Sequence, residues 1–260
     1  MEFLRHAERA ALHVSVSQIR AFLACPKRYE YRYVLGAEPE HRASNLVLGS
    51  TVHSALAGYY LALRDGATPD PAQVLAHYDH AFGEEAKGEP AVLLDEGETL
   101  DDVRAGGAAL VRAFLAGAPE SGTVLAVEAP VFADIVDPAS GEVLEEQLLA
   151  YLDAVVEIDG KPVVVEHKTA ARAWSQDQLD FDLQVSLYLA LTGAQFLRLQ
   201  VLTKTKVPKL LVHDLRRTER ELVEAVEVVC RVLDAIRAGA FWPNLGWGCR
   251  DCEFRKRCRG

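Results

Sequence analysis

Hydrophobic residues recur at helical spacing through most of the first 120 residues of the chain. Leu48, Val52, Leu56 and Tyr60, for example, stand four positions apart, which places them on one face of a helix. Serine caps and a proline suited to a first turn supply start signals. The pattern predicts helices at residues 15–24, 26–35, 46–64, 71–86 and 98–117.

Beyond residue 120, apolar and polar residues alternate or apolar residues form short runs, and both patterns are typical of β-strands. Strands are predicted at residues 123–135, 146–158, 162–169, 196–203 and 209–215, and helices at residues 177–193 and 218–238. This order predicts an α/β fold, with a mixed sheet flanked by helices. We expect one domain over residues 1–260, with an inserted helical region at about 40–120, a core at about 121–240 and a cysteine-rich C-terminal segment at 241–260 that is joined to Cys25.

Composition and charge narrow the class of protein. The chain is 50% hydrophobic, has no run of eighteen apolar residues and does not begin like a signal peptide, so we expect a soluble cytoplasmic protein. A net charge of −10 argues against a surface that binds nucleic acid everywhere. Basic residues nevertheless gather locally, at Lys27, Arg28 and Arg32, at Lys204, Lys206 and Lys209, and at Arg250, Arg255, Lys256, Arg257 and Arg259. Basic clusters of this kind can bind phosphates along one groove.

A hairpin carries the candidate chemistry. Asp159-Gly160 between two apolar runs predicts a two-residue turn, in which paired residues have numbers that add to 319. Asp153 then lies opposite Glu166, and Lys168 shares the face of Glu166 because side chains alternate along a strand. In the same register Pro162 lies opposite Glu157 in a non-hydrogen-bonded pair, where the missing N–H does little harm.

Two facing carboxylates on a sheet destabilise it unless a positive charge lies between them. A divalent cation such as Mg²⁺ would supply that charge, because hard cations take carboxylate oxygens. The alternative is an edge of the sheet with solvated acids and a lysine that reaches into water. The spacing alone leaves both interpretations open.

Four of the five cysteines form a second pattern, with Cys25 alone near the start and Cys249, Cys252 and Cys258 close together at the end. The fifth, Cys230, falls in an apolar helical stretch and is expected in the core. Four thiolates can hold a Zn²⁺ ion or a [4Fe–4S] cluster, and the spacing of one distant cysteine plus a trio favours the cluster. Unrelated cysteines are the remaining alternative. Either metal would tie the two ends of the chain together, which stabilises the fold by on the order of 4 kcal/mol.

These patterns, in this order, resemble the iron–sulfur nucleases of the PD-(D/E)XK superfamily, in particular the RecB/AddB-type nuclease domain and the CRISPR-associated four-cysteine exonucleases. The motifs are SVSQIRAFLACPKRYEYRYVLG, LGSTVHSAL, LLAYLDAVVEIDGKPVVVEHKTA and LQVSLYLAL, followed by the cysteine trio. The resemblance spans Ser15 to Cys258. One departure is Leu152 in place of the proline that gives the superfamily its name, and another is the absence of a helicase region.

The resemblance implies a restriction-endonuclease-like fold with an iron–sulfur-stapled C-terminus and a role for each candidate residue. His53, Asp153 and Glu166 would bind Mg²⁺ or Mn²⁺ through their side chains, and His167 through its carbonyl. Lys168 would position water and stabilise developing negative charge. Gln184 and Tyr188, one helical turn apart, would contact Lys168 or the DNA backbone, although core packing is also open for Tyr188. Cys25, Cys249, Cys252 and Cys258 would hold the [4Fe–4S] cluster, and Glu128 is a weaker candidate for an outer acid.

The implied function is a metal-dependent deoxyribonuclease, an exonuclease or flap-type endonuclease on single-stranded DNA ends, in repair, recombination or defence. The implied partners are DNA and a helicase or other repair or defence proteins, with no membrane. A non-catalytic DNA-binding or scaffold subunit of a larger nuclease–helicase complex is the alternative. A zinc-stapled nuclease is a third possibility.

Overall fold

The structure, a computed structural model, describes residues 4–6, 12–119 and 122–260. Within these residues, seven strands form one mixed sheet in the order β1-β5-β6-β7-β8-β9, with β2 paired in parallel to β6. The strands are β1 (Leu4–His6), β2 (His13–Ser15), β5 (Thr123–Val136), β6 (Val143–Ile158), β7 (Lys161–Ala170), β8 (Leu197–Thr203) and β9 (Lys209–Leu215). The pair β7–β8 is parallel, whereas β5–β6, β6–β7 and β8–β9 are antiparallel. The predicted α/β fold with a mixed sheet is confirmed.

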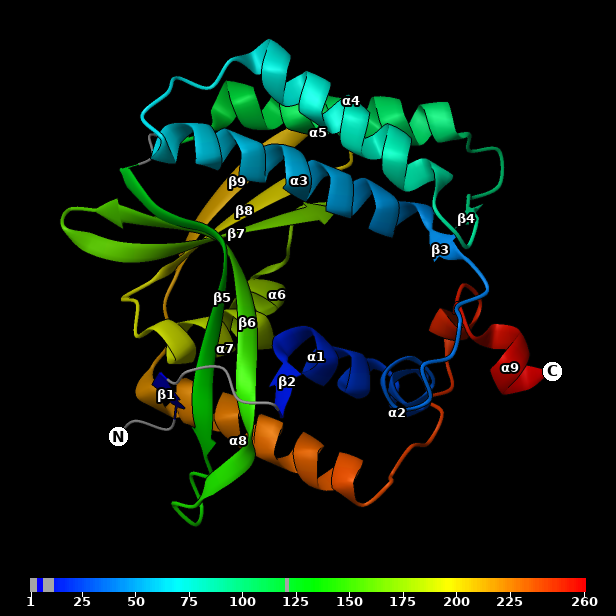
Figure 1. Ribbon diagram of the computed structural model, residues 1–260, viewed down its shortest axis with the longest axis vertical. Coiled ribbons are helices and arrows are strands. Elements are labelled where there is room, and N and C mark those ends of the chain that lie inside the picture. The colour runs from blue at the N-terminus through cyan, green and yellow to red at the C-terminus, as the bar shows by residue number, and fades with distance from the viewer. Residues whose placement is uncertain (1–3, 7–11, 120–121) are drawn as a thin grey trace.

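Helices cover both faces of this sheet (Figure 1). They are α1 (Val16–Ala24), α2 (Pro26–Tyr29), the π-helical turn η1 (Glu30–Val34), α3 (Ser44–Arg64), α4 (Pro71–Lys87), α5 (Leu100–Gly117), α6 (Gln176–Phe181), α7 (Leu183–Thr192), α8 (Glu219–Arg237), the 3₁₀ turn η2 (Trp247–Cys249) and α9 (Arg255–Arg259). A small second sheet pairs β3 (Arg42–Ala43) with β4 (Val92–Leu93). Helices α3, α4 and α5 form the upper layer in Figure 1, and α1, α7 and α8 the lower layer.

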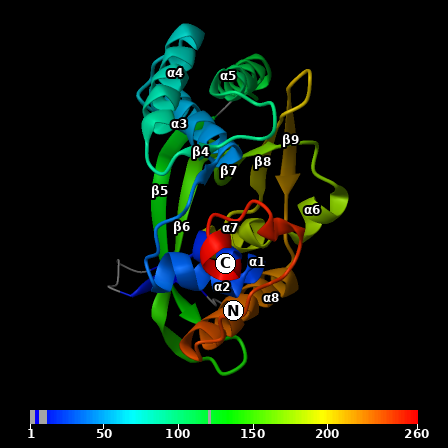
Figure 2. The ribbon, with the colours of Figure 1, turned by 90° about the vertical axis from the view of Figure 1, so that its right-hand side faces the viewer.

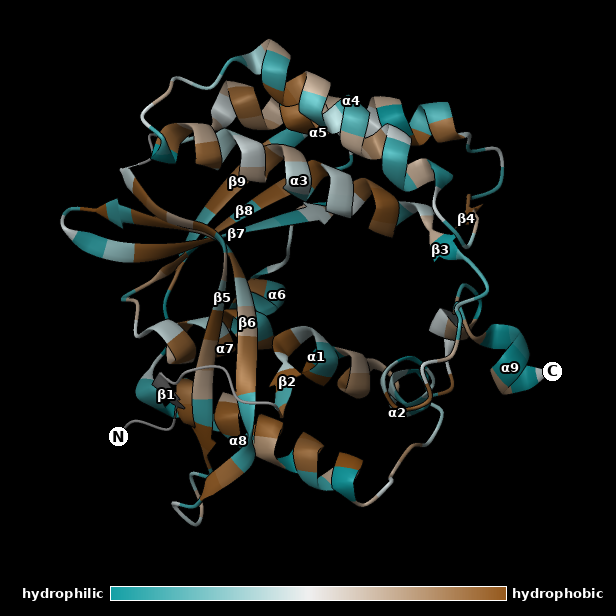
Figure 3. Ribbon diagram, in the orientation of Figure 1, coloured by the Kyte–Doolittle hydropathy of each residue, from teal (hydrophilic) through white to brown (hydrophobic). Residues whose placement is uncertain are grey.

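The layers follow from the burial of both faces of the central strands. Val163 and Val165 of β7 pack into the apolar cluster under α3–α5, and Val164 between them packs into the cluster with α1, α7 and α8. A strand that is apolar on both faces is typical of a sheet covered on both sides. In Figure 3 the central strands are largely brown, brown and teal alternate along the covering helices, and α9 is largely teal.

Helix α3 is the one helix among the described residues that is long and apolar enough to cross a membrane by length and composition. Its buried residues, including Val52, Leu56 and Tyr60, pack in the cluster with α4 and α5. The core of a folded domain therefore accounts for its apolar character.

Two predicted helices differ from those in the structure. The predicted helix at residues 177–193 is two helices, because Asp182 leaves helical geometry and its carboxylate accepts the N–H of Val185 as the cap of α7. The predicted helix at residues 26–35 is α-helical only to Tyr29 and continues as a π-turn. The short strand β2 was not predicted, since three residues carry too little alternation to stand out.

Candidate active site

Strands β6 and β7 are joined by the two-residue turn that the sequence predicts. Asp159 and Gly160 have φ values of 51° and 72°, the two positive values of a type I′ turn. Ile158 pairs with Lys161, Glu157 with Pro162, and the register continues to the pair Ala154 and Val165. The predicted register is confirmed over this stretch.

The ladder ends one pair before the predicted one, so Asp153 and Glu166 are not ladder partners. Leu152 packs in the lower apolar cluster and Ala154 in the upper one, which shows that β6 twists at Asp153. Because the strands separate here, the Oδ2 atom of Asp153 accepts the backbone N–H of His167 at 2.7 Å. The predicted pairing of Asp153 with Glu166 is therefore wrong. The two strands separate at this point, and the Asp153 carboxylate is held beside β7.

Helix α3 brings the predicted histidine to the same point. Nδ1 of His53 lies 3.2 Å from Oδ1 of Asp153. Burial opposes protonation of His53, but its hydrogen bond to Asp153 and the charges of Asp153 and Glu166 raise its pKa overall. Burial likewise opposes ionisation of Asp153, and the bond and charge of His53 outweigh it, so the pKa of Asp153 is lowered. Asp153 is therefore ionised at neutral pH.

Glu166 lies on the other side of the gap and is 3% exposed. Its Oε1 atom accepts Nζ of Lys168 and, at 2.8 Å, Nε2 of Gln184. Its Oε2 atom is buried and has no hydrogen-bond partner. Burial is the main cause that raises the pKa of Glu166, the charge of Asp153 adds to it, and Lys168 opposes both. A cation beside Oε2 would satisfy this oxygen and favour the ionised form.

Gln184 of α7 fixes the position of Lys168. Its Oε1 atom accepts Nζ of Lys168 at 2.9 Å and a guanidinium N–H of Arg20 at 2.5 Å. Arg20 also lies 3.9 Å from Asp182. The predicted contact of Gln184 with Lys168 is confirmed. Arg20 was not singled out from the sequence, because only the packing of α1 against α7 brings it here.

Tyr188 packs in the core directly beside the Gln184 side chain, so its role at the site stays a prediction. Its hydroxyl donates to the backbone carbonyl of Tyr151 at 2.8 Å, and the side chain is 5% exposed within the lower apolar cluster. Burial raises the pKa of Tyr188, so it stays protonated. Its place in the structure is thus core packing, the alternative that the sequence left open.

The His167 ring also belongs to the core. It is 2% exposed and packs against Tyr60 and Phe114, with ring centroids 5.4 and 5.7 Å away. Burial lowers its pKa to about 4, so the ring is neutral. The main chain of His167 lies at the site through its N–H bond to Asp153, and the metal contact predicted for its carbonyl stays a prediction.

Among the described residues, no three or more His, Cys, Asp or Glu side chains are arranged so that they could hold a metal ion as they stand. The donor set nevertheless suits a hard divalent cation. Two carboxylates and an imidazole converge on the strand gap, and one buried carboxylate oxygen lacks a partner.

A comparison with known protein families identifies the family of this chain. A family model for the PD-(D/E)XK nuclease superfamily matches residues 13–259, nearly the whole chain. The chain belongs to the PD-(D/E)XK nuclease superfamily. Nucleases of this superfamily typically use a divalent metal, and the assignment of Asp153, Glu166 and Lys168 to its motif stays a prediction.

Solved structures agree at the level of the fold. A protein from Eubacterium rectale that carries the provisional name exonuclease is 16% identical, with a TM-score of 0.55, 98% of this chain covered and 94% of that chain. SSO0001 is also 16% identical, with 97% and 88% covered, but its TM-score of 0.47 is too low to carry an argument. No curated protein matches the chain.

A large groove opens beside the site of this PD-(D/E)XK protein. It has a volume of 1420 Å³, and its lining includes His53, Asp153 and Glu128. Glu128 has a φ of 48°, and burial and the charge of Asp153 raise its pKa. It lines the groove, and its role as an outer acid stays a prediction. Acidic residues outnumber basic ones in the lining, where Glu38, Glu85, Glu89, Glu128 and Asp153 face Arg32, Arg42 and Lys204.

The four cysteines predicted to act together line one small cavity of 30 Å³. All are free thiols, and the cavity is also lined by the basic residues Lys27, Arg28, Arg255 and Arg259. Cys230 is buried in the core of α8, as predicted. The sequence-distant Cys25 and the C-terminal trio are therefore neighbours, and a basic surrounding suits negatively charged thiolates.

Proposed function

We propose that this protein is a metal-dependent deoxyribonuclease that hydrolyses phosphodiester bonds at single-stranded DNA ends, as an exonuclease. The observation that carries the proposal is the strand gap between β6 and β7. There the ionised Asp153, the buried Glu166 with an unpartnered oxygen, and His53 lie beside a lysine that two side chains hold in place.

Asp153, Glu166, His53 and the His167 carbonyl would hold Mg²⁺ or Mn²⁺. When bound, such an ion acidifies water and neutralises phosphate charge. Mn²⁺ suits the imidazole nitrogen of His53. The N–H of His167 fixes the orientation of Asp153, so this carboxylate is positioned before substrate arrives.

Lys168 supplies the positive charge that the reaction needs at the attacked phosphate. Glu166 and Gln184 hold its Nζ atom, and the side chain is only 20% exposed. In such a partly dry site, a fixed ammonium group stabilises negative charge more strongly than in water. We infer that Lys168 orients the attacking water and stabilises the charge that develops on the phosphate oxygens.

The cysteine cavity is the proposed site of a [4Fe–4S] cluster held by Cys25, Cys249, Cys252 and Cys258. Its role would be structural, tying the C-terminal segment to α2, and thiolates persist best in a reducing compartment such as the cytoplasm. Zn²⁺ is the second candidate, since a 30 Å³ cavity takes a single ion with less displacement than four irons. Absorbance near 400 nm together with iron content, measured after anaerobic purification, distinguishes the two.

We propose that the whole chain acts as one domain and that any unwinding of duplex DNA comes from a helicase or another repair or defence protein.

The test is a digest of 5′- and 3′-labelled single strands with Mg²⁺, Mn²⁺ or a chelator. We expect cleavage with either ion, none with chelator, and loss of cleavage in Asp153→Asn, which keeps the shape of the side chain. Binding without cleavage under every condition would contradict the proposal and favour a DNA-binding or scaffold subunit.

A further inference from the structure

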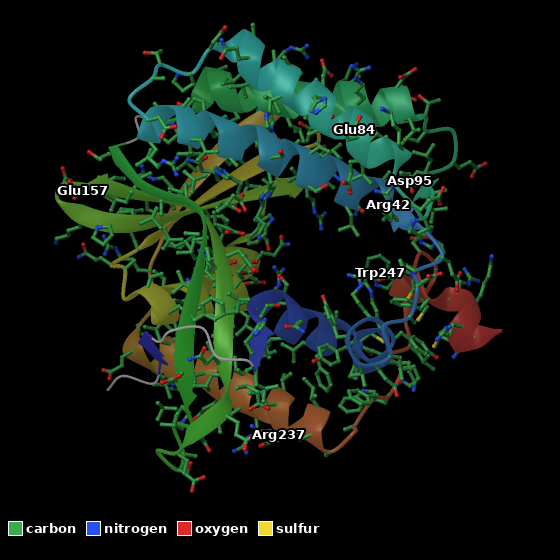
Figure 4. All side chains as sticks on the ribbon, in the orientation of Figure 1. Arg42, Glu84, Asp95, Glu157, Arg237 and Trp247 are labelled. Atoms are coloured by element: carbon green, nitrogen blue, oxygen red, sulfur yellow. The ribbon has the colours of Figure 1, made fainter. Side chains whose placement is uncertain are left out.

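Arg20 of α1 is a positively charged residue at the site that the proposed mechanism does not use. Helices α1 and α7 lie side by side in the lower layer, as Figure 2 shows from the right-hand side of Figure 1. Their packing brings Arg20 into contact with Gln184, although 164 positions of sequence separate the two residues. Helix α1 also borders the space between the two layers, which stays open when the side chains are drawn (Figure 4).

The guanidinium group of Arg20 and the ammonium group of Lys168 donate to the same oxygen atom. Oε1 of Gln184 accepts an N–H of Arg20 at 2.5 Å and Nζ of Lys168 at 2.9 Å. Two positive groups at such short range repel each other unless negative charge lies beside both. The carboxylate of Glu166, which is bonded to Nζ, supplies that charge for Lys168.

Arg20 is less well balanced. The guanidinium lies 3.9 Å from Oδ2 of Asp182, too far for a hydrogen bond, and the other oxygen of Asp182 caps α7. Arg198, by contrast, makes two hydrogen bonds of 2.8 Å to Asp214. Within the described ranges, the bond to Gln184 and this long ion pair are the hydrogen bonds and ion pairs of the Arg20 side chain. Because that side chain is 44% exposed, its remaining N–H groups are available to a ligand.

A backbone phosphate of DNA is the anion that suits this pair of cations. A guanidinium group presents its N–H donors in a fixed fork, which matches the oxygens of a phosphate group. The groove beside the site is lined by more acidic than basic residues, so a phosphate meets few other positive groups there. Phosphates follow one another along a strand. When Lys168 contacts the attacked phosphate, a neighbouring phosphate therefore has Arg20 as the adjacent cation.

We propose that Arg20 binds the phosphate next to the attacked one, so that Lys168 and Arg20 hold two successive phosphates of the strand. This inference rests on the proposed function and adds a substrate-binding residue to it. Arg20 exchanges its long ion pair with Asp182 for a charge-assisted hydrogen bond to the phosphate. Its bond to Gln184 meanwhile keeps the guanidinium in place beside Lys168.

Replacement of single phosphates by a neutral methylphosphonate tests the contact. An end-labelled single strand with one such linkage is cleaved with Mn²⁺, and the rate is measured for the bonds on either side of the linkage. In the wild type, the bond on one side should be cleaved at least about tenfold more slowly than in the unmodified strand, because a charge-assisted hydrogen bond is lost. In Arg20→Met the neutral linkage should leave the rate at that bond unchanged.

The same experiment separates a direct contact from a role through Gln184 alone. If Arg20 only held Gln184 in place for Lys168, Arg20→Met would slow the cleavage of modified and unmodified strands by the same factor. The neutral linkage would then slow the variant as much as it slows the wild type. That result would overturn the proposal and leave the nuclease function intact.

A binding measurement tests Arg20 even if no cleavage is seen. The affinity for a labelled single strand is measured by fluorescence anisotropy at several salt concentrations, with Ca²⁺ in place of the active ion. Loss of one phosphate contact should make the slope of log K against log salt concentration less steep by about 0.7 in Arg20→Met. Arg20→Lys keeps the charge and should keep the slope of the wild type.

Arg231→Met is the matched control for this measurement. Arg231 also has a long ion pair, 3.7 Å from Asp234, but it is 77% exposed on α8. Its slope should equal that of the wild type. A slope that is unchanged in Arg20→Met, or equally reduced in Arg231→Met, would overturn the proposal. Absence of cleavage with Mg²⁺ or Mn²⁺ would contradict only the proposed function.

Discussion

Burial of the Glu166 carboxyl group lowers the free energy of unfolding at the pH where this group ionises. Burial raises its pKa above the value in an unfolded chain, in spite of Lys168. The folded state therefore binds this proton more tightly, and the resulting stability is present at low pH and lost as pH rises through the folded pKa. A group that makes the apo protein less stable at neutral pH is typical of a functional site.

Replacement of Glu166 with glutamine should consequently stabilise the apo protein at pH 8. Glutamine keeps the shape without the buried charge, while Lys168, 20% exposed, can turn toward water. The gain should be on the order of 1 kcal/mol or more and should disappear toward pH 4, since one pKa unit is about 1.4 kcal/mol. Thermal unfolding with chelator present measures it, and a variant less stable than the wild type at pH 8 would contradict the assignment.

Gln184 and Tyr188 stand one helical turn apart. Substitutions at these two residues allow the positioning of Lys168 to be tested separately from core packing. Gln184→Ala removes the acceptor that holds Lys168 and should lower kcat on the order of 10²-fold. Tyr188→Phe removes the bond to the Tyr151 carbonyl and a contact with the Gln184 side chain, and it should lower the free energy of unfolding by about 1 kcal/mol with little change in kcat. Steady-state kinetics and urea unfolding of the two variants check these predictions. Equal losses of kcat in Gln184→Ala and Tyr188→Phe would contradict the role of Gln184 in positioning Lys168.

At the scale of elements, the hairpin was predictable and the gap in it was not. The Asp159-Gly160 turn and the register up to Ala154 and Val165 follow from local sequence, because turn chemistry fixes the pairing. The end of the ladder at Asp153 depends on how β6 packs against both clusters, which local sequence does not encode. For the same reason the place of Arg20 at the site could not be predicted, and the sequence left both core packing and a site contact open for Tyr188.

The turn itself can be tested with a pair of glycines. Gly160 has a φ of 72°, and no other atom would crowd a methyl group added there, so Gly160→Ala should lower the free energy of unfolding by about 1–2 kcal/mol through backbone strain alone. Gly83 of α4 has equally open space and helical geometry, so Gly83→Ala should raise stability by about 1 kcal/mol. Urea unfolding of the two variants gives the comparison, and a shift in the same direction for both would contradict the assigned turn.

At the scale of the whole molecule, the segment around Cys25 meets the C-terminal segment at the cysteines. The side-chain amide of Asn244 donates to the carbonyl of Ala24 at 3.0 Å, and the backbone N–H of Asn244 lies 3.4 Å from Sγ of Cys25. The closure therefore has polar support besides any metal. The sequence indicated this closure through cysteine spacing. The bonds of Glu253 with Arg28 and Arg32 could not be foreseen, since Glu253 belongs to no recognisable motif.

Loss of the cluster proposed at the cysteines should weaken the closure without destroying the core of the domain. Cys25→Ser should remove iron and the absorbance near 400 nm and lower the free energy of unfolding by up to about 4 kcal/mol, as expected for release of a long loop. Cys230→Ser, a change in the core of α8, should keep the iron. Iron retained in Cys25→Ser would contradict the proposed ligand set.

The most direct test of the central claim is the cleavage of end-labelled single-stranded DNA with Mn²⁺ by Lys168→Ala, beside Lys161→Ala as control. Both lysines lie on β7, but Lys161 is exposed at the hairpin turn and Lys168 is held at the gap by Glu166 and Gln184. We predict that Lys168→Ala folds, binds DNA and loses cleavage by at least about 10³-fold, as for the removal of a group that stabilises charge in the transition state. Undiminished cleavage by Lys168→Ala would contradict the account.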